Sequence, residues 1–169
     1  PMLKQLGLEV EFIPSAVSIG IGTDVARVSS REALKAYQSQ LEKYFPDSKA
    51  DIARIMREVG KVMGYIAVLY GIDNPLFLDL TKDPRYLMRT ILPWMLRYAL
   101  TMPKVKRLMG PVDEHLVRFS RNQALVDIIA QHFFRETPAF FALSYFSLYL
   151  DYQYPKGGTG ALARAGRGW

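Results

Sequence analysis

The stretch that decides the fold is residues 48–69, SKADIARIMREVGKVMGYIAVL, the strongest helical pattern in the chain. Its apolar residues recur every three or four positions, as they do on one face of an α-helix. They are Ile52, Ile55, Met56, Val59, Val62, Met63, Ile66 and Leu69. Ser48 and Asp51 can cap the start of this helix, and Gly71 with the Asp73-Asn74-Pro75 turn ends it. The middle of the chain is therefore predicted to be helical.

The segment before this pattern is predicted to be β-structure. Apolar and acidic residues alternate over Leu8–Ile13, which is typical of a half-buried strand, and Pro14 ends the pattern. Val17–Ile21 and Val25–Val28 are β-branched runs. The short Gly22-Thr23-Asp24 connection between them predicts a hairpin.

Further helices are predicted on both sides of the central one. Ser29 as N-cap and Glu32 at N3 form a capping box that starts a helix ending at Pro46. After residue 75, we expect a helix starting at Asp83-Pro84, shorter helices at 113–119, 122–132 and 139–149, and a strand at 150–154.

The pattern predicts an α+β fold, a small antiparallel sheet with a mainly helical cap. We expect one domain at 1–162 and a tail at 163–169. Both ends read as cut from a longer protein.

Composition excludes several classes of protein. The chain has 169 residues, of which half are apolar and 22% charged, and it has no cysteine. This is not a disordered tail, a disulfide scaffold or a cysteine-ligated zinc site. The longest charge-free runs, 11 residues at 62–72 and 14 at 137–150, are too short for a membrane-spanning helix of about 20 residues. A cytoplasmic, peripherally membrane-associated protein is expected.

The net charge of +6 is localised. Residues 82–121 hold nine cations and three anions, so this segment carries the whole excess. Such a balance indicates nucleic acid or an anionic membrane as the partner. The chain has no nucleic-acid-binding motif and no interleaving of aromatic and basic residues, so we expect no nucleic-acid partner.

Residues 83–107 form a basic amphipathic stretch. On a helical wheel the arginines occupy one half, and Trp94 with most leucines and methionines occupies the other. Pro93 is expected to kink the helix or to restart it. The pattern suits a helix lying in a membrane interface, and it equally suits a surface helix whose apolar half covers a core. The candidate docking residues are Arg85, Arg89, Trp94, Arg97, Lys104, Lys106 and Arg107.

Few residues point to catalysis. The two histidines, His115 and His132, lack a second ligand at metal-binding spacing, and no G-x-S-x-G motif is present. We therefore expect no metal site and assign no catalytic residue. A glycine cluster, Tyr154-Pro155-Lys156-Gly157-Gly158, predicts a turn. Its backbone N–H groups could also approach a flat or anionic ligand closely.

This cluster, with Leu162, resembles the [YW]-P-x-G-G-x-x-x-L signature of carotenoid-type desaturases. These FAD-dependent oxidoreductases include phytoene desaturase, carotenoid isomerase and retinol saturase. Glu136-Thr137-Pro138-Ala139, with the aromatic helix after it, is similar to the family's approach to that signature. Leu6-Gly7-Leu8 and the strand, hairpin and helix after it resemble the start of the family's substrate domain. The resemblance covers residues 1–162.

The resemblance implies the substrate domain of a flavoprotein that acts on an isoprenoid-like lipid. It implies that Pro155, Gly157 and Gly158 approach the FAD. The G-x-G-x-x-G fingerprint that would hold the dinucleotide is absent from this chain. It also implies an aromatic substrate lining, Phe133, Phe134, Phe140, Phe141, Tyr145 and Phe146.

Three questions stay open from the sequence. Desaturation, isomerisation and saturation share this domain plan, so the reaction is not assigned. The alternative function is a non-enzymatic helical module that binds lipid or protein through residues 84–102. An excised domain could also associate with itself through a former interface.

Overall fold

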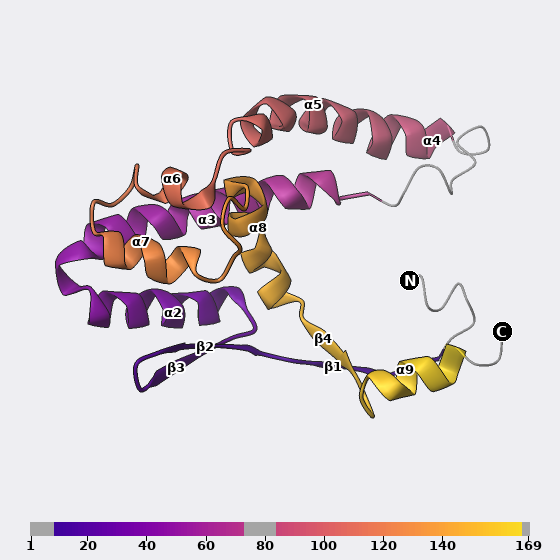
Figure 1. Ribbon diagram of the computed structural model, residues 1–169. Helices are drawn as coiled ribbons and strands as arrows, with labels where there is room; N and C mark the ends of the chain where they lie inside the picture. Colours follow the sequence, from indigo (N-terminus) through magenta and orange to yellow (C-terminus); the bar gives the residue numbers. More distant parts are fainter. Residues whose placement is uncertain (1–8, 73–83, 167–169) are drawn as a thin grey trace. The chain divides into compact units, whose positions relative to one another are not determined.

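The computed structural model describes residues 9–72 and 84–166 (Figure 1). The described residues are mainly helical, with two antiparallel sheets of two strands each. This confirms the predicted α+β class, although the small sheet is two separate strand pairs. The described residues form two compact units. One contains the residues up to Gln40 and those from Leu148 onward, and the other is Leu41–Ser147.

The first unit contains the predicted hairpin. Strand β2 (Val17–Ile21) pairs with β3 (Asp24–Val28), with Val17 opposite Val28. Gly22 turns the chain at a φ of 59°, in the left-handed region that glycine adopts without strain. Alternate side chains are buried, namely Ile19, Ile21, Ala26 and Val28. The hairpin prediction is confirmed.

The second strand pair joins two segments that are far apart in the sequence. Strand β1 (Phe12–Pro14) runs antiparallel to β4 (Gln153–Pro155), with Phe12 opposite Pro155 (Figure 1). The predictions at 8–13 and 150–154 were wrong in their bounds, and residue 8 lies outside the described residues. Pro14 belongs to β1 instead of ending the strand. All of β1 is exposed, so alternation of apolar and polar residues does not mark its bounds.

Two helices belong partly or wholly to this unit. Helix α2 (Arg31–Tyr44) is capped by Ser30 instead of Ser29, because the Ala33 backbone N–H donates to the Ser30 hydroxyl oxygen at 3.2 Å. Helix α9 (Thr159–Ala165) follows β4.

The second unit is organised on the central helix. A short 3₁₀ turn, η1 (Pro46–Ser48), leads into α3 (Lys49–Leu69). The predicted apolar face is confirmed, since its buried residues are Ile52, Ile55, Val59, Val62 and Met63. The Ser48 hydroxyl does not cap α3, because it accepts a hydrogen bond from the Asn122 side-chain amide at 3.0 Å. The predicted turn at 73–75 lies outside the described residues.

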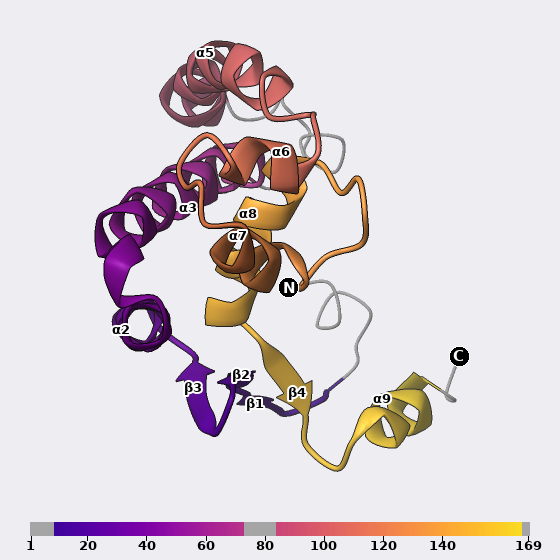
Figure 2. The same cartoon turned by 60° about the vertical axis from the view of Figure 1, so that its left-hand side comes forward.

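The basic stretch is one continuous helical segment. It consists of α4 (Pro84–Tyr86), a π-turn η3 (Leu87–Ile91) and α5 (Leu92–Lys106). The Leu92 N–H donates to the carbonyl five residues earlier, and this wider turn precedes Pro93, which has no N–H to donate. The helix also continues through Pro103. Both views place α5 beside α3 (Figures 1 and 2).

Three short helices complete this unit. They are α6 (Val112–Leu116), α7 (Gln123–Ala130) and α8 (Ala139–Leu150). The first two are shorter than predicted. Asn122 caps α7 by accepting from the Leu125 N–H at 3.3 Å. Large side chains from all three are buried, among them Leu116, Ile129 and Phe146. Among the helices that the structure describes, none has the length and apolar character needed to span a bilayer.

Candidate functional site

Helix α5 packs on α3 through a narrow stripe. Ile91, Thr101 and Val105 are its buried side chains, and Trp94 is half-buried. The Trp94 indole N–H donates to the Val68 carbonyl of α3 at 2.6 Å. Trp94, a predicted docking residue, therefore fastens α5 to its neighbour within this unit.

Other large apolar side chains of this helical segment are left uncovered by the described residues. Five side chains, from the π-turn through α5, expose between 53% and 64% of their surface. They form what we call the apolar ridge, Met88, Leu92, Met95, Leu96 and Leu100. Contiguous exposed apolar surface of this kind commonly marks an interaction site. An apolar half that covers a core is therefore not what the described residues show.

The predicted docking cations surround this helix and are all exposed. Arg89 and Arg97 line a pocket of about 410 Å³ beside Trp94, at the α3–α5 contact. Lys104 and Arg107 line a second pocket near the other end of α5, which we call the His115 pocket. Two cationic pockets thus lie along one helix pair.

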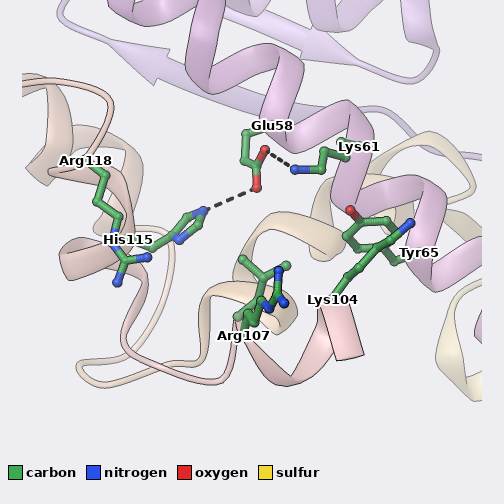
Figure 3. Close-up of a pocket in the computed structure, with 8 residues that line it drawn as sticks. Glu58, Lys61, Tyr65, Lys104, Arg107, His115 and Arg118 are labelled. Atoms are coloured by element: carbon green, nitrogen blue, oxygen red, sulfur yellow. Dashed lines mark hydrogen bonds and ion pairs between the residues drawn. The ribbon is translucent and has the colours of Figure 1, made fainter. Parts of the chain in front are cut away.

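The His115 pocket has a volume of about 400 Å³ (Figure 3). Helix α3 contributes one wall, and the end of α5 with the chain around α6 contributes the rest. Its lining is Glu58, Lys61, Tyr65, Lys104, Arg107, Leu108, His115 and Arg118. The lining therefore contains four cations and one carboxylate. No sequence pattern pointed to this cluster, because helix packing brings Glu58 and His115 together from distant parts of the chain.

Glu58 is the centre of the polar contacts in this pocket. Its carboxylate accepts from the Lys61 ammonium at 3.1 Å, and its Oε1 lies 3.5 Å from the His115 Nε2 (Figure 3). The hydrogen bond raises the pKa of Lys61. Burial lowers the pKa of His115, an effect that the Glu58 carboxylate opposes and the Arg118 cation reinforces. His115 is 9% exposed, and its Nε2 has no hydrogen-bond partner among the described residues.

Four of the six predicted substrate-lining aromatics are brought together. Phe133 lies edge-on to Tyr145 and Phe146, with ring centroids 6.1 and 6.5 Å apart, and Phe141 lies 5.7 Å from Tyr145. Phe146 is buried in the core, whereas Phe141 is exposed. The remaining two differ in exposure. Phe134 is 92% exposed, and Phe140 is half-buried.

The predicted cofactor-contacting turn is a tight glycine turn. Gly157 and Gly158 have φ values of 83° and 78°, which residues with a Cβ rarely adopt. The Gly158 N–H donates to the carbonyl of the buried Pro155 at 2.9 Å, and the Lys156 ammonium pairs with Glu11 at 2.7 Å. The turn itself therefore requires both glycines.

The described histidine and carboxylate side chains do not meet the needs of a metal site, which takes three or more such ligands in one place. Within residues 9–72 and 84–166, no three of them come together in such a cluster. His132 packs against Phe133 with ring centroids 6.2 Å apart, and burial lowers the pKa of its imidazole.

Comparison with known protein families, with curated proteins and with solved structures found no match to this chain. The resemblance of Tyr154–Leu162 to the carotenoid-type desaturases stays a prediction.

Proposed function

We propose that this chain is the membrane-docking and lipid-substrate-binding domain of an FAD-dependent oxidoreductase of the carotenoid desaturase type. The observation that carries the docking role is the apolar ridge of α5, together with the cations beside it. Apolar side chains can enter the acyl boundary of a bilayer while nearby arginines contact acidic headgroups. The partner we infer is an anionic membrane surface, because the excess positive charge of the chain lies in this segment.

The pairing of β1 with β4 supports the idea of an inserted domain. Antiparallel pairing places Phe12–Pro14 beside Gln153–Pro155, so the segment between these two strands begins and ends at neighbouring positions. A domain inserted into a host needs such neighbouring connections. Glu11 and Lys156, just outside the strand pair, add an ion pair at that position.

The aromatic cluster supports the lipid-binding role. Phe133, Phe141 and Tyr145 are not wholly buried, so they offer rings to an apolar ligand, whereas Phe146 supports them from the core. Helix α8, which carries three of the four, continues along the chain into β4 and the glycine turn. In this proposal the chain positions the lipid and excludes water.

FAD would accept the hydride, and another part of the enzyme would hold it. The glycine turn fits the approach of a flat ring, because a Cβ built on Gly158 would meet no atom within 4 Å. Titrating FAD with the purified 169-residue chain tests this division of roles. We expect no change in flavin fluorescence, and tight flavin binding by the chain alone would contradict the proposal.

Vesicle co-sedimentation tests the docking role. Replacing Arg85, Arg89 and Arg97 by Gln should weaken binding to vesicles containing phosphatidylserine by about 3 kcal/mol, since each cation contributes about 1 kcal/mol at an anionic surface. The matched control replaces three exposed cations on other helices, Lys35, Lys49 and Arg57. An equal loss of binding in both triple variants would show that only net charge matters.

The second candidate is a non-enzymatic helical module that binds lipid or protein through residues 84–102. It is favoured by one observation, that the ridge and both cationic pockets belong to the unit that lacks the glycine turn. Gly157→Ala in the flavoprotein that contains this segment separates the two. The first proposal expects turnover to collapse, and the matched Gly160→Ala in α9 to retain it. Unchanged turnover in Gly157→Ala favours the module.

A further inference from the structure

The His115 pocket has a composition that membrane docking does not explain. Three of its side chains, Glu58, Lys61 and Tyr65, come from α3, and the Lys104 ammonium of α5 lies 5.8 Å from the centre of the Tyr65 ring (Figure 3). Docking through the apolar ridge requires only cations on the exposed side of α5. The pocket also contains cations from α3 and from the chain around α6, which indicates that it binds a separate ligand.

The charges identify the chemistry of that ligand. The lining includes four cations, Lys61, Lys104, Arg107 and Arg118, and a single carboxylate, Glu58, so the pocket carries an excess of three positive charges when His115 is neutral. Cations gathered in one pocket repel one another, and a polyanion relieves this repulsion. This excess excludes a metal cation as the occupant.

From this we propose that the His115 pocket binds the phosphate group of a phosphomonoester. A phosphomonoester carries between about −1.5 and −2 charges at pH 7 and offers three strong acceptor oxygens. Arg107 and Arg118 can each donate two parallel hydrogen bonds to such a group, and Lys61 and Lys104 supply point charges. A carboxylate offers one charge and two oxygens, so it would leave more of the excess unpaired.

Glu58 and His115 have a supporting role in this site. The Glu58 carboxylate holds the Lys61 ammonium at 3.1 Å and faces the His115 Nε2 at 3.5 Å. A bound dianion would favour a proton on the buried Nε2, which has no hydrogen-bond partner in the described structure. Phosphate binding should therefore take up a proton at this position.

The volume of the pocket leaves room for more than phosphate. About 400 Å³ lies within the range of small-molecule sites, roughly 300–1,000 Å³. The phosphate could belong to a free ester or to a lipid headgroup, and both offer the same group to these residues. The proposal does not depend on the oxidoreductase role.

Calorimetry and vesicle binding test the site with the whole chain. The test variant is R107Q/R118Q, and the matched control is R57Q/R121Q, which removes two exposed arginines that do not line the pocket. The probes are inorganic phosphate, glycerol 3-phosphate, and vesicles in which phosphatidic acid replaces phosphatidylserine at equal surface charge. Circular dichroism checks that both variants are folded.

Two results would support the proposal and distinguish the sources of phosphate. A free-ester site predicts that the chain binds glycerol 3-phosphate and that R107Q/R118Q binds it about 100-fold more weakly, since the loss of each arginine with its charge-assisted hydrogen bonds accounts for about tenfold or more. A headgroup site predicts a preference for phosphatidic acid that this variant loses. If R107Q/R118Q and R57Q/R121Q behave alike with every probe, the proposal is overturned. The experiments with inorganic phosphate and glycerol 3-phosphate do not require membrane binding, so they test the pocket even if the apolar ridge does not dock to a membrane.

Discussion

Replacing Leu92, Leu96 and Leu100 by Gln should abolish tight membrane binding without unfolding the protein. These three residues of the apolar ridge lie four positions apart and are 53%, 64% and 62% exposed. Complete burial of a leucine side chain contributes about 1.5–3 kcal/mol, so burying the exposed half contributes about 1 kcal/mol each. The triple variant should lose about 3 kcal/mol, which raises the Kd about 100-fold.

The matched control lies on the same helical segment. Ile91 is 5% exposed and packs in the buried stripe. Ile91→Ala should lower the free energy of unfolding by about 2–5 kcal/mol and leave the ridge intact. Gln has a helix propensity close to that of Leu, so the ridge variant should unfold with nearly the wild-type midpoint.

The assay is co-sedimentation with vesicles of phosphatidylcholine and phosphatidylserine, with urea unfolding followed by circular dichroism. Wild-type binding by the ridge variant would refute the proposed docking face. A loss of stability in the ridge variant as large as that of Ile91→Ala would mean that the ridge is covered in solution. In that case the exposed fractions used to calculate its contribution would not apply.

Three further predictions concern stability. Burial lowers the pKa of His115 and His132 below 6.5, so the unfolded chain binds more protons than the folded one. The free energy of unfolding should fall as pH drops below about 6.5, and H115Q/H132Q should flatten this slope in urea titrations at pH 7.5 and 5.5. Trp94→Phe removes a 2.6 Å hydrogen bond to α3 and should cost about 1 kcal/mol by urea unfolding. Ser30→Ala should cost about 1 kcal/mol in the same assay, and Ser29→Ala much less, since Ser30 is the cap; equal losses would contradict the assignment.

The sequence predicts the elements whose determinants are local. The apolar spacing of α3 identified the residues that are buried, because a helix of six turns averages over small irregularities. The glycine turn was predictable because only glycine adopts those φ values easily. The cap of α2 was predicted one residue early, since two adjacent serines offer the same side chain and only the geometry selects Ser30.

The features that depend on neighbouring elements were not predictable. A regular helical wheel assigned half of 84–102 as one apolar face, but the π-turn at Leu87–Ile91 changes the phase of the helix. Burial on α5 is then set by contact with α3, which covers a stripe narrower than the apolar half. The His115 pocket could not be predicted from the sequence, because it also depends on contacts between helices. Its members meet only through the packing of three helices.

The pairing of β1 with β4 also has a consequence for the order of folding. Phe12 and Pro155 are about 140 residues apart, and closing a loop of that length in a flexible chain costs about 4 kcal/mol in entropy. A ribbon of three residue pairs, exposed along β1, does not offset that cost unaided. The ribbon therefore forms on a chain whose intervening helices are already ordered. Protection of its amide protons from hydrogen exchange would report the last step of folding.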